Sequence, residues 1–494
     1  MDFYPLLAAR VSVATLAACV GLPSAVAEAR PSKSMPGDEG VAGEDEDEAP
    51  DGDVEGPVDD TEEVEEDEDA SDVASEAGST RTATAGDSED PPDPKIETGS
   101  IGRGPPIPTE TPNMPREKLL KGREKLVEDL EVRVTGSISM SVNYRAWPNQ
   151  EGDGPEGPQA LFERVAVGLD GIYKGFIVSA DYRFYRKYAT VHHGYIGYRY
   201  GDVFEIDAGV HRVPFGILPY ASHNWFETLP YYVGLADDYD LGLKSMFHKG
   251  GLTAHLAYYV QAEPSQFGAT QDSARYSYDV VLTDETELGD SGVTSAQSNE
   301  EKHTAVGRIA YEWKHRGEDK TEIGASGQFG GLYNRETERF GTRWAAALHY
   351  TGWYRGFNFQ LEGLYYDNRP QNPDGQPRTW LTMGAWDAPY RVARRGAIVV
   401  GNIAYRLPLS GRVFEWVMFY NDHSFLWKPD AGFDYSQMNT TGVLIANRYV
   451  YIYLDAATGR NHPWFNPEYG NALAEGEDDP HWWLWVNLSL GFYM

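Results

Sequence analysis

Cysteine is nearly missing from this sequence of 494 residues: Cys19 is the single one, so an intramolecular disulfide framework is excluded. Long apolar runs are missing as well. No stretch reaches the roughly 18 apolar residues of a membrane-spanning helix, which excludes a helical membrane protein. The usual catalytic signatures, a G-x-S-x-G elbow, an H-E-x-x-H pair and a P-loop, are also missing, so we expect no enzyme.

Two clusters of reactive residue types carry little chemistry in this context. The adjacent Ser222, His223 and Asn224 do not form a hydrolase triad, because neighbouring side chains diverge. His192 and His193 are expected to point to opposite faces of a strand, and therefore not to share a metal ion.

A third cluster is acidic. Asp237, Asp238 and Asp240 could bind Ca²⁺ together with loop carbonyls. A solvated loop with local Asx turns is the preferred interpretation. We therefore predict no metal site and no cofactor, and we expect no nucleic-acid partner.

Residues 1–27 have the layout of a secretory signal peptide. Arg10 precedes an apolar run, which is followed by Pro23 and the small-residue site at 25–27. An alternative stays open, because Leu-Ala-Ala-Cys at residues 16–19 resembles a lipobox, in which Cys19 would carry a lipid.

Residues 28–115 form an acidic and proline-rich segment. Between Pro31 and Ser100, 26 acidic and three basic residues account for 23 of the 34 net negative charges of the chain. Such a composition buries too little apolar surface to offset chain entropy, so we expect a disordered periplasmic spacer. A reservoir for divalent cations or a docking tail for a basic partner is the alternative.

Residues 116–130 predict one short amphipathic helix. Leu119, Leu126 and Leu130 lie on one face, separated by Lys and Glu. A helix this short needs a partner in water. Two partners are considered: the barrel described next, or the same helix of neighbouring subunits.

From residue 131 onward the apolar period changes from 3.6 to 2, the period of β-strands. Apolar and polar residues alternate at 132–144, 176–184, 252–260 and 357–363. We count about 16 such stretches, an even number as in bacterial outer-membrane barrels, with short and long connections in alternation. The predicted fold class is all-β: a transmembrane antiparallel β-barrel at residues 131–494, preceded by the disordered acidic segment and the short helix.

The last stretch shows the pattern most clearly. Every even position from Trp482 to Met494 is apolar, whereas Asn487 and Ser489 are polar. We expect the even face, with Leu488, to contact lipid and the odd face to line the barrel interior.

One connection breaks the alternation. Residues 211–240 contain three prolines and many aromatic side chains, so they do not form a ladder strand. Their apolar side chains need burial, and the inner barrel wall is the nearest surface. We expect this loop to fold into the lumen, where irregular backbone is tolerated, and to set the narrowest point.

The sequence Gly-Val-His-Arg-Val-Pro-Phe-Gly at 209–216, followed by Glu227 and Gly242, resembles the phosphate-selective porin O/P family. The likeness covers roughly Glu131 to Met494. It implies a 16-stranded, trimeric outer-membrane porin whose third loop constricts the pore. It also places the basic position of the motif at Arg212. We expect a pore constriction at three residues: Arg212, Phe215 and Glu227.

Charges of both signs are expected on the inner wall. The polar strand faces bring in seven acidic residues and a comparable set of basic ones, so the signs nearly cancel. The arginines predicted to line the pore are Arg133, Arg183, Arg199, Arg308, Arg343 and Arg406. A basic cluster, Arg391, Arg394 and Arg395, is expected at the rim, where it would attract lipopolysaccharide or solute phosphate.

The predicted function is an outer-membrane porin of a Gram-negative bacterium for passive diffusion of small polar solutes, with an anion or phosphate preference implied by the resemblance. The expected partners are outer-membrane lipid and lipopolysaccharide, small polar or anionic solutes, and further copies in a homotrimer. The alternative is a receptor or adhesin barrel whose long extracellular loops bind a partner. Conductance separates the two, because a plugged barrel shows none.

Overall fold

The computed structural model describes residues 130–147, 157–224, 226–263, 272–283, 297–411, 413–466 and 469–494. All of them belong to the second of the two compact units of the chain, Pro94–Met494. The predicted signal peptide at 1–27, the acidic segment at 28–115 and the helix at 116–130 lie outside the described residues, except for Leu130. This residue opens the first strand instead of ending a helix.

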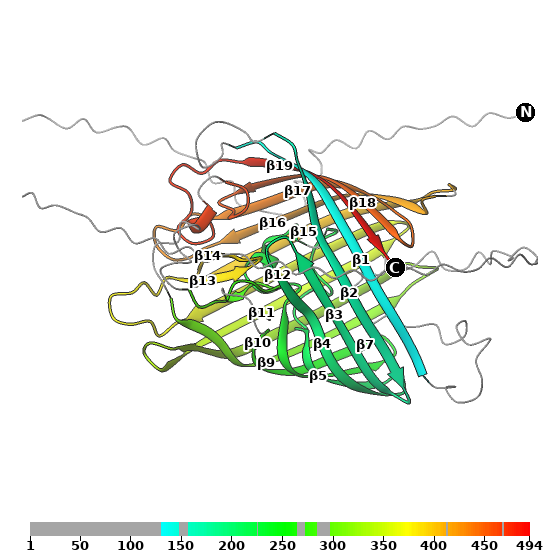
Figure 1. Ribbon diagram of the computed structural model, residues 1–494, viewed down its shortest axis with the longest axis horizontal. Helices are drawn as coiled ribbons and strands as arrows, with labels where there is room; N and C mark the ends of the chain where they lie inside the picture. Colours follow the sequence, from blue (N-terminus) through cyan, green and yellow to red (C-terminus); the bar gives the residue numbers. More distant parts are fainter. Residues whose placement is uncertain are drawn as a thin grey trace, which may run out of the picture. The chain divides into compact units, whose positions relative to one another are not determined.

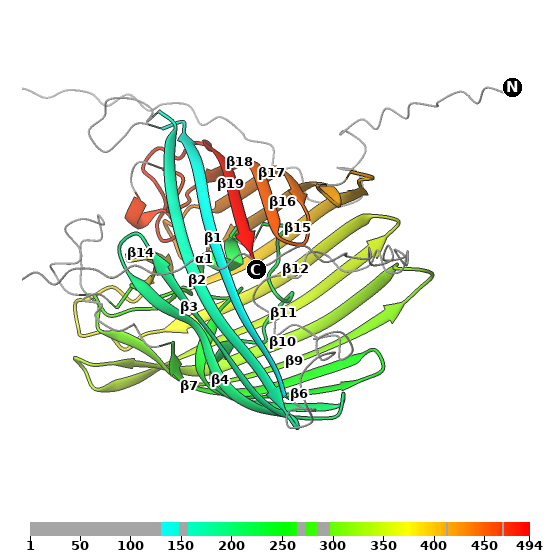
Figure 2. The ribbon, with the colours of Figure 1, turned by 45° about the vertical axis from the view of Figure 1, so that its right-hand side comes forward.

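Sixteen strands close into one antiparallel barrel, with β1 and β19 side by side as the closing pair (Figures 1 and 2). The count confirms the sequence prediction. The barrel strands are β1 (Leu130–Arg145), β2 (Gln159–Tyr173), β3 (Phe176–Tyr185), β4 (Ala189–Tyr200), β5 (Phe204–Arg212), β6 (Tyr239–Lys249), β7 (Leu252–Ala262), β9 (Asn299–Lys314), β10 (Lys320–Asn334), β11 (Arg339–Tyr354), β12 (Phe357–Arg369), β15 (Arg395–Pro408), β16 (Trp416–Trp427), β17 (Ser436–Ala446), β18 (Val450–Arg460) and β19 (Trp483–Tyr493).

The two faces of the wall differ as the period-2 pattern predicts. In β19, Asn487 is 3 % exposed, whereas the adjacent Leu488 is 44 % exposed on the outside. The same alternation recurs in β11, where Arg343 and His349 are buried and Leu348 faces outward. Apolar residues therefore form the outer surface of the barrel.

Exposed aromatic side chains gather where the strands meet the short turns, as in the interface girdles of membrane barrels. They are Tyr173, Phe176, Tyr198, Tyr200, Phe204, Phe247, Tyr311, Trp313, Phe357 and Tyr405. The start of β1 and the end of β19 lie at this same end. The connections at the other end include four long ones, 213–238, 263–298, 370–394 and 461–482.

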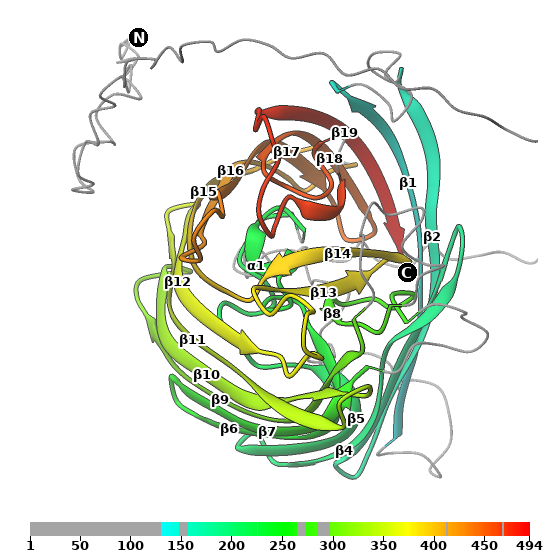
Figure 3. The same cartoon turned by 90° about the vertical axis from the view of Figure 1, so that its left-hand side faces the viewer.

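The long connections carry structure of their own inside the ring of strands. The strands β8 (Asp279–Val280), β13 (Trp380–Ala385) and β14 (Ala388–Ala393) form a small sheet. Figure 3 shows this sheet and the short helix α1 (Leu229–Tyr232) within the ring. Trp386 and Asp387 turn the β13–β14 hairpin with positive φ angles of 61° and 59°, as a tight two-residue turn requires.

A hydrophobic core joins these connections to the inner wall. Tyr231 and Tyr232 of α1 pack against Tyr278, and Tyr278 packs against Tyr390 of β14. The core continues into the 461–482 connection through Phe465. Loops thus fill part of the lumen at their end of the barrel. No helix in the described ranges is long and apolar enough to cross a membrane.

Candidate functional site

The connection between β5 and β6, residues 213–238, is called the lumen loop below. Most of its described side chains are buried, and its apolar residues belong to the core inside the barrel. The prediction that this loop folds into the lumen is confirmed. Its polar atoms bond to the inner faces of strands far from β5 in the barrel, so the loop crosses to the opposite wall.

The first half of the loop is fixed at Gly216 and Ile217. The backbone N–H of Gly216 donates to Ser326 Oγ on β10 over 2.8 Å, and that of Ile217 donates to Glu362 Oε2 on β12 over 2.6 Å. Arg308 Nε on β9 donates to the Gly216 carbonyl over 2.9 Å. Gly216 has a φ of 61°, and a Cβ there would lie 2.4 Å from Glu362. The glycine of the Pro-Phe-Gly motif is needed for this close approach.

The middle of the loop is fixed by charge. His223 Nδ1 lies 2.5 Å from Asp422 Oδ1 on β16, and its Nε2 lies 2.8 Å from Asn358 Oδ1 on β12. Asn224 donates to Asp455 on β18 over 2.8 Å. Burial disfavours the charged imidazole, but the Asp422 carboxylate and the hydrogen bonds outweigh it, so the pKa of His223 is raised above its ordinary value. The Asp422 carboxylate thus favours the protonated imidazole at the contact that joins the loop to the wall.

The second half of the loop is fixed at Glu227 and Leu229. Glu227 is 0 % exposed and accepts a hydrogen bond from Thr440 Oγ1 on β17, while Leu229 N–H donates to Ser424 Oγ on β16 over 3.0 Å. Burial, and next the charge of Asp455, raise the pKa of Glu227 well above its usual range. Its carboxyl is therefore held in the neutral form.

The three residues predicted at the constriction lie in different surroundings. Arg212, the last residue of β5, donates from Nη2 to the Tyr239 hydroxyl over 2.8 Å and lies 3.2 Å from Asp237 Oδ1. Phe215 and Glu227 are buried and hold the loop in place. The structure does not bring Arg212 and Glu227 into contact. Among the three, Arg212 keeps the most exposed side chain.

The arginines predicted to line the pore are largely paired with carboxylates. Arg133 lies on the inner face at the start of β1, opposite Asp170 in the strand register. The other five pairs are Arg183–Asp181 (2.7 Å), Arg199–Glu205 (2.5 Å), Arg308–Glu322 (2.7 Å), Arg343–Glu301 and Arg406–Glu318 (3.8 Å). Within this set no row of uncompensated basic groups crosses the lumen, as the near balance of charge in the sequence predicts.

The predicted basic rim is not an open patch. Arg391 lies in β14, where its guanidinium stacks over Trp380 at 4.4 Å and its side chain is buried. Arg394 and Arg395 both pair with Asp430, over 3.2 and 2.8 Å. Arg394 also lies 3.5 Å from Asp367 Oδ1, so two carboxylates offset the charges of Arg394 and Arg395, and the expectation of an exposed, uncompensated anion-attracting cluster is wrong.

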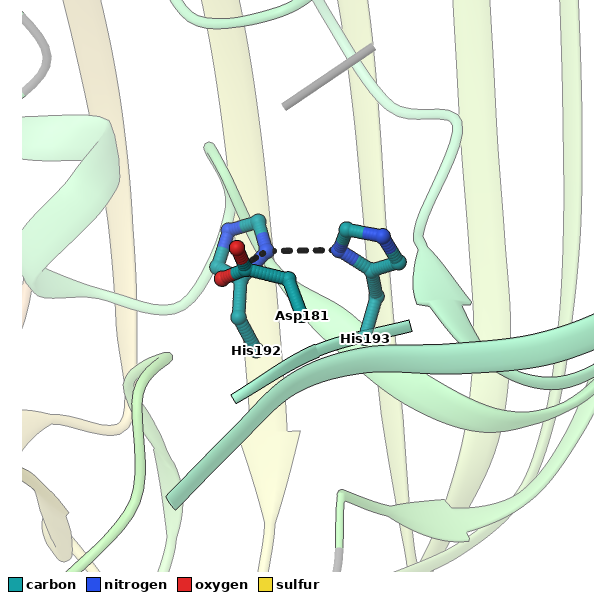
Figure 4. A group of neighbouring side chains, drawn as sticks. All are labelled: Asp181, His192 and His193. Atoms are coloured by element: carbon teal, nitrogen blue, oxygen red, sulfur yellow. Dashed lines mark hydrogen bonds and ion pairs between the residues drawn. The ribbon is translucent and has the colours of Figure 1, made fainter. Parts of the chain in front are cut away.

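The prediction that His192 and His193 face opposite ways is wrong. A β-bulge in β4 pairs Asp181 with His193 and Tyr182 with Val191, so His192 is the extra residue and both rings face inward. Figure 4 shows the two rings beside Asp181, and their Nδ1 atoms lie 2.8 Å apart. Asp181 is already bonded to Arg183 over 2.7 Å. Since these groups bond to one another, we assign no metal here.

The acidic stretch near β6 also differs from its prediction. Asp237, Asp238 and Asp240 are all buried, so the interpretation as a solvated loop is wrong. Asp237 accepts a hydrogen bond from the Tyr276 hydroxyl over 2.6 Å. The side chains of Ser222, His223 and Asn224, by contrast, bond to different partners and diverge as expected.

Sequence reasoning missed the carboxylates that receive the lumen loop, Asp422 and Asp455. Both side chains point to the inner face of the barrel, as do the buried residues at alternate positions of the same strands. That orientation was readable from the apolar alternation in β16 and β18. Their partners were not readable, because His223 is 199 residues from Asp422.

These features together define a class of protein. The barrel has an even number of antiparallel strands, an apolar outer surface with aromatic rows, short turns at one end and long loops at the other. This combination belongs to the β-barrels of the Gram-negative outer membrane, in which closure of the sheet leaves no unpaired strand edge in the lipid. The protein is an outer-membrane β-barrel.

Comparison with known proteins gives a consistent but distant picture. No family model matches the chain, and no curated protein matches it. Solved structures that match include the outer-membrane channel DcaP of Acinetobacter baumannii, at 9 % identity, 75 % coverage of this chain, 99 % coverage of that one and a TM-score of 0.49. An anion-selective porin from Comamonas acidovorans matches at 13 % identity, 74 % and 100 % coverage and a TM-score of 0.43. OmpF of Salmonella typhi, in complex with daunomycin, matches at 11 % identity, 74 % and 97 % coverage and a TM-score of 0.45. With TM-scores below 0.5, these likenesses say nothing about the function of this chain.

Proposed function

We propose that the protein is an outer-membrane porin, a non-enzymatic channel for passive diffusion of small polar solutes. One observation carries this proposal. The lumen loop leaves β5, crosses the barrel and is fixed by hydrogen bonds to the inner faces of six strands between β9 and β18. A loop fixed in this way narrows the lumen of a barrel, and the polar inner wall beside the loop remains in contact with water. Such a barrel passes small solutes and excludes large ones.

The channel is proposed to be weakly selective. The resemblance to phosphate-selective porins favours anions, and rings of Arg or Lys select anions where a bore is narrow. Five of the six arginines predicted to line this pore are paired with carboxylates, which cancels most of their field. Arg212 beside the lumen loop also lies 3.2 Å from Asp237, so its field is partly compensated as well, and the proposed anion preference is small.

The apolar outer surface supports contact with outer-membrane lipid and lipopolysaccharide. A homotrimer, implied by the same resemblance, is part of the proposal, and chemical cross-linking in detergent tests it. A single cross-linked species of three chains supports the trimer, and a monomer at every cross-linker concentration counts against it.

Selectivity is tested by reversal potential in planar bilayers with asymmetric KCl. Arg212→Glu should move the reversal potential toward cations, because one charge in a narrow, low-dielectric bore acts strongly. Arg199→Glu is the matched control, since Arg199 lies near the short-turn end and pairs with Glu205. A shift of equal size in both variants, or in neither, counts against a constriction at the lumen loop.

A receptor or adhesin barrel is the second candidate, and the sheet of β8, β13 and β14 within the ring favours it (Figure 3). Loops that close the lumen completely would bind a partner outside and conduct nothing. Swelling of proteoliposomes in sugars of increasing size separates the two functions. The porin admits small sugars with a sharp size limit, and the receptor admits none.

A further inference from the structure

Four buried carboxylates meet inside the barrel near the long-loop end of β6 and β7. Asp238 ends the lumen loop, Asp240 is the second residue of β6, Glu263 follows β7 directly, and Asp279 opens β8. Each side chain offers one oxygen, and these four oxygens all lie within 4.8 Å of one another. The four residues are only 1–4 % exposed. Segments far apart in the sequence thus bring four acidic groups to one point away from water.

Hydrogen bonds account for only part of this cluster. Glu263 accepts from the backbone N–H and the hydroxyl of Ser277, both over 2.7 Å, and Asp279 Oδ2 accepts from Arg275 Nη1 over 3.2 Å. The Oδ1 atoms of Asp238, Asp240 and Asp279 are buried and accept no hydrogen bond from any described residue. Orphaned acceptors of this kind, next to one another, point to a ligand that supplies positive charge.

The nearby basic side chains do not balance the cluster. The guanidinium of Arg275 pairs with two carboxylates. It lies 3.2 Å from Asp279 and 2.5 Å from Asp272, which is not part of the cluster. Arg343, the other basic neighbour of Asp238, pairs with Glu301. Burial, and next the neighbouring carboxylates, raise the pKa of both Asp238 and Glu263 well above the usual range. Without a cation, the buried charges repel and are expensive to keep ionised.

We propose that Asp238, Asp240, Glu263 and Asp279 form a calcium-binding site that ties the end of the lumen loop to the β7–β9 connection. All four ligands are oxygens, which hard cations prefer. Calcium–oxygen distances are about 2.3–2.6 Å, so oxygens on opposite sides of the ion lie about 4.6–5.2 Å apart. The four oxygens, all within 4.8 Å of one another, are close enough together to surround one such ion. Magnesium requires oxygens at about 2.0–2.1 Å in strict octahedral geometry and keeps several waters, which suits this enclosed cluster less well.

The site goes beyond the proposed function and has its own readout. The full chain in detergent is stripped with EGTA and titrated with CaCl₂ by calorimetry, with thermal unfolding followed in parallel. The acidic N-terminal stretch also attracts divalent cations, so the comparison between variants carries the result. Wild type should bind one tight Ca²⁺ per chain and unfold at a higher temperature in Ca²⁺ than in EGTA.

The variant Asp238→Asn/Asp240→Asn should bind Ca²⁺ at this site about tenfold or more weakly, because two charged ligands are lost. In EGTA it should be at least as stable as wild type, since fewer buried charges repel, whereas in Ca²⁺ it should be less stable. A purely structural defect would lower stability in both conditions. Asp434→Asn is the control, because this carboxylate bonds Arg460 over 3.0 Å, outside the cluster.

Three results would overturn the site: no tight calcium in wild type, an unfolding temperature that ignores Ca²⁺, or an equal response to Mg²⁺. An equal loss of calcium binding in Asp434→Asn would overturn it as well.

Discussion

The ion pair between His223 and Asp422 makes the docking of the lumen loop depend on pH. Because the pKa of His223 is raised in the folded protein, its contribution to stability is present below its unfolded pKa of about 6.5. The contribution is lost as the pH rises through the folded value. We expect the stability of wild type, relative to Asp422→Asn, to fall between pH 6 and pH 9.

Thermal unfolding of both proteins across that pH range checks this prediction. At pH 6 the variant should be less stable by about 3–5 kcal/mol, the usual cost of leaving one member of a buried pair alone. A difference between the two proteins that stays constant from pH 6 to pH 9 would mean that His223 is uncharged and that the contact is a neutral hydrogen bond.

Glu227 gives a second pH-dependent prediction, in which the uncharged form of the side chain, not the charged one, stabilises the fold. Its carboxyl is buried, its Oε1 accepts no hydrogen bond from the described residues, and its pKa is raised well above the usual range. The stabilising neutral form is fully present below the unfolded pKa of about 4.3 and is lost as the pH rises through the folded value. Glu227→Gln removes this ionisation.

We therefore expect Glu227→Gln to be as stable as wild type near pH 4 and more stable near pH 9, as read from the midpoint of thermal unfolding. A variant that is less stable than wild type at pH 9 would show that the carboxylate is needed in its charged form.

At the scale of the element, β19 tests the orientation of the wall. Leu488 faces outward, so Leu488→Arg puts a charge on the lipid face at a cost of about 2–4 kcal/mol near the midplane. Asn487 faces inward and lies 3.4 Å from Asp455, so Asn487→Arg gains an acidic neighbour. Heat-resistant migration on gels should be lost in the first variant and kept in the second. Equal assembly of both would contradict the assigned facing.

The strands were predictable because their period is local. The stretches at 132–144 and 357–363, for example, fall within β1 and β12. The hairpin of β13 and β14 was not predicted. It is buried on both faces because loops surround it, so it lacks the alternation of a wall strand. Its turn at Trp386 and Asp387 lacks the usual glycine or asparagine.

The site was predictable only in part, for the same physical reason. The apolar content of the lumen loop, including Phe215 and Ile217, required burial, and that requirement placed the loop correctly. The bulge that turns His192 inward depends on the register with β3. The cluster of Asp238, Asp240, Glu263 and Asp279 depends on the end of the lumen loop, the start of β6 and the 263–298 connection meeting in space, which no local pattern records.

At the scale of the whole molecule, the described residues form one closed barrel whose own long connections occupy part of its lumen. The lumen loop crosses the interior of the barrel. The sheet of β8, β13 and β14 packs against this loop through the ring contacts of Tyr278 with Tyr231 and with Tyr390. Nearer the short turns the inner face carries polar side chains, with Ser179 of β3 and Asp207 of β5 as examples. A porin has a water-filled path between these loops and the inner wall, and a closed receptor barrel has none.

Single-channel conductance in planar bilayers tests the central claim, that the lumen loop is the constriction of an open channel. We expect wild type to show discrete, low-conductance openings. Deleting residues 222–230 removes the contacts of His223, Asn224 and Glu227 with the wall, and should raise the conductance of each channel. Silence of the wild-type protein at every voltage, or the same conductance with and without this segment, would contradict the account.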